Sequence, residues 1–208
     1  MKNNKIIIIG AGGYGSEIFS LLEETTYNSI GFLDKEKDRI NLLGPIIGHE
    51  NELGKLKKNY LFSNVIIAIG DVNKREIIYE SIKKHELDFP LIIDSSAKYI
   101  SEKINRNTGV IIYPNVVIMN NCKIGKFTLV NSGVTIGHDV NIGDFCNINP
   151  GAHLAGKISI GNNTLIGIGS VIKEGVNIGS NAIVGAGSVV IKDVLDNKTV
   201  YGVPAKEV

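Results

Sequence analysis

The first half of the chain alternates short apolar runs with amphipathic stretches. The apolar runs fall at Lys5–Ile9, Ser29–Leu33, Val65–Ile69 and Leu91–Ile93, and the amphipathic stretches fall at Ser16–Glu24 and Lys74–Lys84. Strands that alternate with helices are typical of βαβ units and a parallel sheet. The pattern therefore predicts an α/β, Rossmann-like domain with four strands over residues 1–95.

From Ile112 onward the apolar pattern changes to a period of six. Every sixth residue up to Val190 is aliphatic, and the residue four positions after each of them is small or apolar, as at Val116, Cys122 and Thr128. A fixed hexad repeat is the signature of a parallel β-helix, in which three hexads make one triangular coil. We therefore predict a β-helix domain over residues 96–208, with just under five coils in residues 112–195.

Charge and cysteine content exclude several classes of protein. Lys and Arg number 22 against 21 Asp and Glu, so the net charge of +1 favours neither nucleic acid nor an anionic membrane as a partner. Two cysteines, Cys122 and Cys146, are too few for a disulfide scaffold, and their spacing places them on different faces. The run Ile6–Ile9 is too short for a signal peptide or a membrane span. These features predict a cytoplasmic protein.

The glycine-rich segment near the N-terminus is a candidate ligand site. Gly10, Gly12 and Gly15 form a GxGxxG motif between a predicted strand and a predicted helix, where backbone N–H groups can bind a diphosphate. Asp34 ends the second predicted strand and could accept a ribose hydroxyl. NAD is a rival ligand, but a full dinucleotide fold needs two βαβαβ halves, so a mononucleotide fits the length better. Alternatively, the glycines only tighten the turn.

Three features together resemble the sialic acid O-acetyltransferase and bacillosamine-pathway N-acetyltransferase family of hexapeptide-repeat enzymes. They are the Gly10-Ala-Gly-Gly-Tyr-Gly15 turn, hexads such as Ile136-Gly-His-Asp-Val-Asn, and the terminal Tyr201-Gly-Val-Pro-Ala-Lys206. The resemblance implies a left-handed β-helix, a homotrimer, acetyl-CoA as co-substrate and no metal. It also implies N-acetylation of a nucleotide-linked amino sugar, a UDP- or dTDP-4-amino-4,6-dideoxy sugar.

The resemblance also assigns two groups of binding residues. It implies a nucleotide-sugar pocket at Gly12, Gly13, Tyr14, Asp34, Lys35 and Gly70. It implies an acetyl-CoA groove at Asn147, Gly156, Ile168 and Ala186, where Asn147 replaces a second histidine that relatives often carry. A backbone N–H near Gly156 could stabilise the tetrahedral oxyanion.

His138 is the candidate general base, because its hexad position predicts an outward side chain near a corner. From sequence alone a solvated surface histidine is the alternative. The resemblance makes His138 and Asp139 a catalytic pair, in which the carboxylate raises the basicity of the imidazole. Successive strand side chains point to opposite faces, so this pair requires a bend in the backbone. His49, His85 and His153 are predicted to be surface residues.

Three other functions remain open from the sequence. O-acetylation of sialic acid is the alternative within the same family. A γ-carbonic anhydrase is also a β-helix, but its zinc requires three histidines, and the repeat half carries two. A trimeric scaffold that binds nucleotide without catalysis would show no turnover with any acetyl acceptor.

Overall fold

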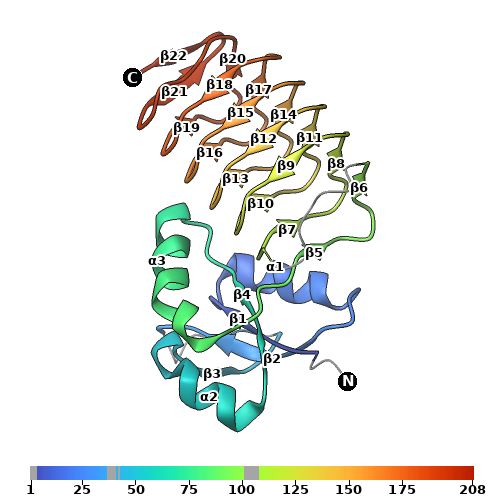
Figure 1. The fold of residues 1–208 in the computed structure, drawn as a ribbon, viewed down its shortest axis with the longest axis vertical. Helices are drawn as coiled ribbons and strands as arrows, with labels where there is room; N and C mark the ends of the chain where they lie inside the picture. Colours follow the sequence, from blue (N-terminus) through green and yellow to red (C-terminus); the bar gives the residue numbers. More distant parts are fainter. Residues whose placement is uncertain (1–3, 37–40, 42, 101–107) are drawn as a thin grey trace. The chain divides into compact units, whose positions relative to one another are not determined.

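The chain divides into two compact units, Met1–Ile92 and Ile93–Val208 (Figure 1). The computed structural model describes residues 4–36, 41, 43–100 and 108–208. The division lies three residues before the boundary that the sequence placed between residues 95 and 96. The first unit is an α/β domain and the second is a parallel β-helix, which confirms the predicted fold class.

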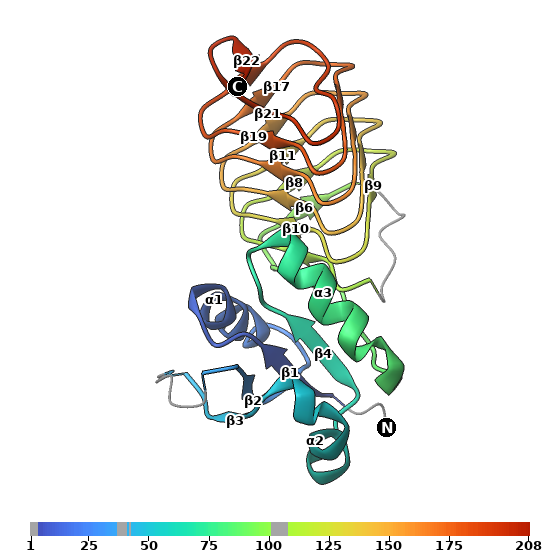
Figure 2. The same ribbon diagram turned by 90° about the vertical axis from the view of Figure 1, so that its left-hand side faces the viewer.

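The first unit is built on a parallel sheet of four strands in the order β3-β2-β1-β4. These strands span Ile46–Gly48, Asn28–Leu33, Lys5–Ile9 and Asn64–Ile67, respectively. Helix α1 (Gly13–Leu22) covers one face, and α2 (Leu53–Tyr60) and α3 (Val72–Ile82) cover the other (Figure 2). Two short 3₁₀ helices, η1 and η2, span Glu50–Glu52 and Lys83–His85. Because both faces are covered, β1 and β4 read as continuous apolar runs, and Ile6, Ile7 and Ile8 are fully buried.

Three elements of this unit differ from the prediction, and one of them is helix α2, which the sequence analysis did not predict. The run Leu91–Ile93 is not the fourth strand of the sheet, because β5 (Ile92–Ile93) pairs instead with the sheets of the β-helix. The fourth strand is β3, whose three residues are too few to show a strand pattern. Both predicted helices begin earlier than expected, since Gly12 and Asp71 are the residues at their N-caps.

The second unit stacks two-residue strands into three parallel sheets. One sheet has the order β22-β21-β19-β16-β13-β10-β7-β5, the second has β20-β17-β14-β11-β8-β6, and the third has β18-β15-β12-β9. From β7 to β20 successive strands of a sheet lie 18 residues apart, as in the pairing of Thr135 with His153, whereas Lys98 of β6 pairs with Val117 at a spacing of 19. The strands span Lys98–Tyr99 (β6), Ile111–Ile112 (β7), Val117–Ile118 (β8), Lys123–Ile124 (β9), Leu129–Val130 (β10), Thr135–Ile136 (β11), Asn141–Ile142 (β12), Asn147–Ile148 (β13), His153–Leu154 (β14), Ser159–Ile160 (β15), Leu165–Ile166 (β16), Val171–Ile172 (β17), Asn177–Ile178 (β18), Ile183–Val184 (β19) and Val189–Val190 (β20).

The β-helix is longer than the hexads indicated. It begins at β5 and β6, before the first regular hexad, and so exceeds the predicted coil count. In the last coil the spacing falls to 16 residues, because Ile183 pairs with Thr199. Strand β21 (Thr199–Gly202) then turns back into an antiparallel pair with β22 (Ala205–Glu207), which ends the stack.

The core of the β-helix consists of the two hexad positions that the sequence identified. All the aliphatic positions are buried except Ile124, which is half-buried, and all the small positions are buried. Polar residues among them bond to backbone: the Thr164 hydroxyl donates to the carbonyl of Gly179 at 2.7 Å. Many turn residues adopt a left-handed φ, such as Asn121 and Asp139 at +59°, which Asn and Asp tolerate better than most side chains.

Candidate active site

The glycine turn of the first unit opens a pocket at the carboxyl ends of its strands. Gly12 is the N-cap of α1 and supplies no side chain to its N–H groups, which leaves a site suited to an anion. The cavity measures about 450 Å³. Its lining includes all six residues expected to bind the nucleotide sugar: Gly12, Gly13, Tyr14, Asp34, Lys35 and Gly70.

The glycines of this turn serve different purposes. A Cβ at Gly10 would lie 2.7 Å from the carbonyl oxygen of Ala68, and one at Gly15 would lie 2.0 Å from that of Gly10. A Cβ at Gly13 would meet no heavy atom within 4 Å. Gly10 and Gly15 are therefore required by packing, whereas Gly13 faces open space in the pocket.

Asp34 fixes the same turn through two backbone hydrogen bonds. Its Oδ2 accepts from the N–H of Ala11 at 2.8 Å, and its Oδ1 accepts from the N–H of Glu36 at 3.0 Å. The residue is 8% exposed. Asp34 therefore holds the loop while it lines the pocket.

Three charged residues of the pocket were not predicted from the sequence. Glu50, Asp71 and Lys74 line the cavity together with the expected residues. Asp71 caps α3 by accepting from the N–H of Lys74 at 3.0 Å, and the pattern of Asp before a helical segment could have identified it. Glu50 follows the short strand β3, so its place at this edge depends on a strand that the sequence did not reveal.

His138 and Asp139 lie together at a turn of the β-helix, as the sequence argument required. His138 Nδ1 is 2.8 Å from Asp139 Oδ2, and the left-handed φ of Asp139 supplies the bend between them. Because a carboxylate only accepts, Nδ1 carries the proton and Nε2 is left as the acceptor. The side chains are 52% and 44% exposed, so an acetyl acceptor can reach the imidazole.

A third side chain completes this cluster, and sequence analysis missed it. Asn121 Nδ2 donates to Asp139 Oδ1 at 2.6 Å from the preceding coil. The hydrogen bonds from Asn121 and then from His138 hold the pKa of the Asp139 carboxyl below its ordinary value. The sequence does contain the signal, because Asn121 precedes Asp139 by one coil of 18 residues.

Gly156 lies beneath the imidazole of His138. A Cβ at this position would be 2.7 Å from His138 Nε2 and 2.8 Å from Cε1. Gly156 follows His138 by one coil, so the ring occupies the space that a side chain would take. Among the expected acetyl-CoA residues, Gly156 is the one that the structure brings to His138.

The other expected acetyl-CoA residues belong to a different sheet of the coil. Asn147 lies in β13 and is 3% exposed. Ile168 and Ala186 follow β16 and β19 of the same sheet, are exposed, and lie one coil apart. His138 and Gly156 follow β11 and β14 of another sheet. One chain thus places these two groups at separate corners of the triangle.

The remaining predicted residues have structural positions. His153 is exposed, and its Nδ1 lies 2.8 Å from Thr135 Oγ1. Cys122 and Cys146 are buried in different sheets, and the Cys122 thiol donates to the carbonyl of Gly137 at 3.0 Å. Burial raises the pKa of the Cys122 thiol. Neither sulfur is accessible to serve as an acyl-enzyme nucleophile.

Within residues 4–36, 41, 43–100 and 108–208, no group of three or more His, Cys, Asp or Glu side chains could hold a metal ion. The described helices are too short or too polar to cross a bilayer.

Comparison with known proteins matches both units. Residues 5–82 match the PglD N-terminal domain, and residues 157–192 match the bacterial transferase hexapeptide repeats. The acetyltransferase domain of PglB from Neisseria gonorrhoeae is 30% identical, with coverage of 99% of this chain and 100% of that one and a TM-score of 0.81.

Two further structures are similar over nearly the whole chain. Perosamine N-acetyltransferase from Caulobacter crescentus, in complex with CoA and GDP-perosamine, is 29% identical, with coverage of 98% and 96% and a TM-score of 0.90. WeeI from Acinetobacter baumannii is 29% identical, with coverage of 98% and 99% and a TM-score of 0.87. With both units matched in order, the chain belongs to the PglD-like family of hexapeptide-repeat sugar N-acetyltransferases.

Proposed function

We propose that this acetyltransferase moves the acetyl group of acetyl-CoA to the amine of a nucleotide-linked 4-amino-4,6-dideoxy sugar. The observation that carries the proposal is the His138–Asp139 pair, whose Nε2 lies exposed above Gly156. The C. crescentus relative was solved with CoA and GDP-perosamine, and the N. gonorrhoeae relative was solved with acetyl-CoA.

The reaction follows from the side chains at this turn. The sugar amine attacks the thioester carbonyl, a C–N bond forms, and His138 Nε2 accepts the proton that the amine loses. A backbone N–H near Gly156 stabilises the oxyanion of the tetrahedral intermediate. Breakdown of this intermediate then breaks the C–S bond. The CoA thiolate takes up a proton as it leaves. Because both cysteines are buried, the acetyl group passes directly to the amine.

The pocket of the first unit is the proposed nucleotide site. The N-terminus of α1, which has no side-chain cap, suits the diphosphate, and Asp34 suits a ribose hydroxyl. The family resemblance favours UDP or dTDP, whereas the C. crescentus relative was solved with a GDP-linked sugar.

Glu50 supports guanine as the base. Asp34 and Asp71 accept backbone hydrogen bonds, while the Glu50 carboxylate, whose side chain is 19% exposed, lies 3.4 Å from His49 Nδ1. Guanine offers two adjacent N–H donors to a carboxylate, but the N–H of uracil and thymine is flanked by carbonyl oxygens, which a carboxylate repels. Glu50 follows β3, two strands from the glycine turn, or about 10 Å at the usual strand spacing.

A homotrimer is proposed from the separation of the two corners. Ile168, which is 59% exposed, and Ala186 lie away from His138 on one chain. A second chain could bring its Ile168 corner beside the His138 corner of the first and complete a groove for acetyl-CoA. Closed cyclic symmetry would repeat this groove at each interface.

The test is a substrate panel. GDP-, UDP- and dTDP-linked 4-amino-4,6-dideoxy sugars are each incubated with acetyl-CoA, free thiol release is recorded, and the product is identified by mass. The His138→Ala variant is the control for enzymatic release. Acetylation of free sialic acid in preference to all amino sugars would support the O-acetyltransferase alternative, and no turnover with any acceptor would support a scaffold.

A further inference from the structure

The turn that carries His138 is built from two columns of residues at coil spacing. Asn120, His138, Gly156 and Glu174 form one column, and Asn121, Asp139 and Lys157 form the next. The φ of Asn121, Asp139 and Lys157 is +59° in each case, so the three backbones present their side chains in the same way. Coils stack about 4.8 Å apart, so neighbours in a column are within reach of one another.

This arrangement gives the Asp139 carboxylate two possible cationic partners. One is the His138 imidazole at 2.8 Å, and the other is the ammonium of Lys157, one coil further along the same column. The positive charge of Lys157 already contributes to lowering the pKa of Asp139. If the ammonium bound Asp139 directly, the carboxylate would be neutralised and turned away from the imidazole.

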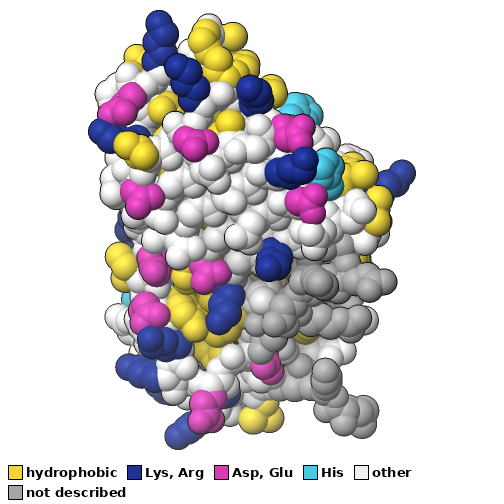
Figure 3. All heavy atoms as spheres, turned by 45° about the horizontal axis from the view of Figure 1, so that its top comes forward, with side chains coloured by type: hydrophobic (Ala, Val, Ile, Leu, Met, Phe, Trp, Pro, Cys, Tyr) yellow, Lys and Arg dark blue, Asp and Glu magenta, His cyan; other side chains and the backbone are white. Residues whose placement is uncertain are grey.

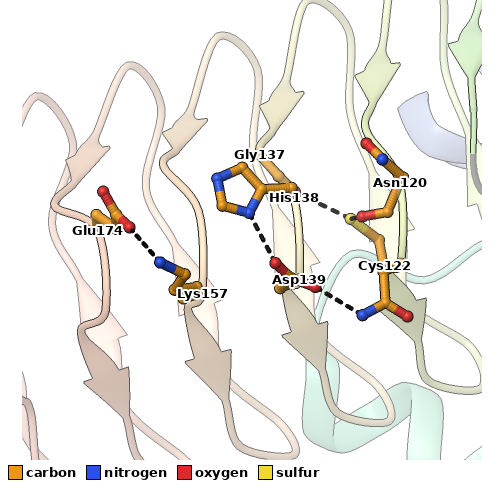
Figure 4. A network of polar contacts seen from close by, with 8 residues as sticks. Asn120, Cys122, Gly137, His138, Asp139, Lys157 and Glu174 are labelled. Atoms are coloured by element: carbon orange, nitrogen blue, oxygen red, sulfur yellow. Dashed lines mark hydrogen bonds and ion pairs between the residues drawn. The ribbon is translucent and has the colours of Figure 1, made fainter.

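Two neighbouring side chains oppose that exchange. Asn121 donates to Asp139 Oδ1 at 2.6 Å, which orients Oδ2 toward His138. Glu174 accepts from Lys157 Nζ at 3.1 Å, which draws the ammonium away from Asp139 (Figure 4). In Figure 3 the histidine side chains at the upper right lie beside lysine or arginine and acidic side chains, and further charged side chains are spread over the same face.

We propose that Asn121 and Glu174 are positioning residues. Asn121 keeps the Asp139 carboxylate hydrogen-bonded to His138, and Glu174 prevents the Lys157 ammonium from binding that carboxylate. The inference rests on the proposed function of His138 as the general base. Among the residues that the structure describes, the charged or titratable groups around His138 are Asp139, Lys157, Glu174 and the Cys122 thiol beneath Gly137. Of these, only Lys157 competes with the imidazole for the carboxylate.

If the ion pair between Lys157 and Glu174 served only the fold, its loss would lower stability and not act on catalysis directly. Lys157 and Glu174 are 62% and 56% exposed, and such surface ion pairs contribute little to stability. Loss of the pair should therefore leave folding unchanged. An effect on catalysis would then have to come from the released ammonium.

The experiment combines Glu174→Gln with Lys157→Met. Glu174→Gln should lower kcat by roughly threefold to tenfold with KM little changed, and should move the acid limb of the kcat/KM profile to lower pH by about 0.5–1 unit, because a neutralised carboxylate no longer favours the imidazolium. Adding Lys157→Met to Glu174→Gln should restore kcat to within about twofold. Glu80→Gln, which breaks the exposed pair between Glu80 of α3 and Lys83 of η2, is the matched control and should change nothing.

Asn121 is tested by two variants that tolerate its left-handed φ. Asn121→Gly removes the amide and should lower kcat, and Asn121→Asp should lower it further because two carboxylates repel. A pH titration of the His138 ring followed by ¹³C NMR measures the effect of Asp139 on the imidazole directly, and it requires no turnover. If the wild type acetylates no acceptor, the proposed function fails, while the NMR shift in Glu174→Gln still tests the network. An unchanged titration in Glu174→Gln, or no rescue by Lys157→Met, would overturn the proposal.

Discussion

Gly156→Ala tests whether the absence of a side chain at Gly156 sets the position of the His138 imidazole, the proposed general base. The added Cβ would lie 2.7 Å from Nε2, 2.8 Å from Cε1 and 3.1 Å from Cδ2 of the imidazole. An ordinary contact begins near 3.4 Å, so the ring must retreat by about 0.7 Å. A misplacement of about 1 Å at a reacting group costs up to about 10²-fold in rate. We expect kcat to fall roughly 30- to 100-fold, or about 2–2.7 kcal/mol in the barrier.

Stability should not fall with activity in this variant. The imidazole is half exposed and can turn toward solvent, so the overlap requires no movement of the backbone. The backbone of Gly156 does not have a positive φ, so alanine fits this position without backbone strain. Alanine also reduces the conformational freedom of the unfolded chain, so Tm should stay the same or rise slightly. Gly137→Ala is the contrasting control, because its Cβ would lie 2.6–2.8 Å from the backbone of Ala155 and Gly156 and should destabilise the coil.

The assay is a double-mutant cycle with steady-state kinetics and thermal unfolding. In a His138→Ala background no ring remains to be displaced, so adding Gly156→Ala should cost nothing further in kcat. If Gly156→Ala costs the same in both backgrounds, or if it raises the KM for acetyl-CoA with kcat unchanged, displacement of His138 is not its mechanism.

His138→Ala should lower kcat by about 10²–10⁴-fold with CoA affinity retained, and activity within threefold of the parent would remove it from the mechanism. Gly13→Val should abolish nucleotide binding in calorimetry without loss of Tm, because its side chain enters open pocket space; tighter binding of NAD than of GDP, UDP or dTDP would contradict the assignment. The hydrogen bonds from Asn121 and His138 hold the pKa of Asp139 below its ordinary value of 3.8, so the carboxylate stays charged as pH falls toward that value, and kcat/KM measured down to that pH should show no separate loss from protonation of Asp139. Burial should protect Cys122 from iodoacetamide at about pH 8 until the protein unfolds, as mass spectrometry of the native protein can verify. Mixed trimers of His138→Ala subunits with Ala186→Trp subunits should regain activity, whereas a fully active monomer on sedimentation would refute the shared groove.

The sequence by itself determined the architecture of the second unit. Each hexad must supply one aliphatic and one small inward residue, because identical positions stack directly above one another, and that constraint appears at every sixth position from Ile112 to Val190. The same regularity located His138 on an outward turn and separated Cys122 from Cys146. The glycine motif located the pocket of the first unit, because a turn between a strand and a helix is defined by residues that are close together in the sequence.

Only the tertiary structure decided which elements and side chains meet. Strand β3 is too short to show a strand pattern in the sequence. Strand β5 is apolar and could belong by its sequence to the sheet of the first unit or to the β-helix. Only the pairing of β3 with β2 and of β5 with β7 shows which sheet each strand joins. Gly156 and Asn121 reach His138 and Asp139 across coils, and Glu50 reaches the pocket from the edge strand of the sheet. Such contacts depend on distances between residues far apart in the chain, which a local pattern of residue types does not encode.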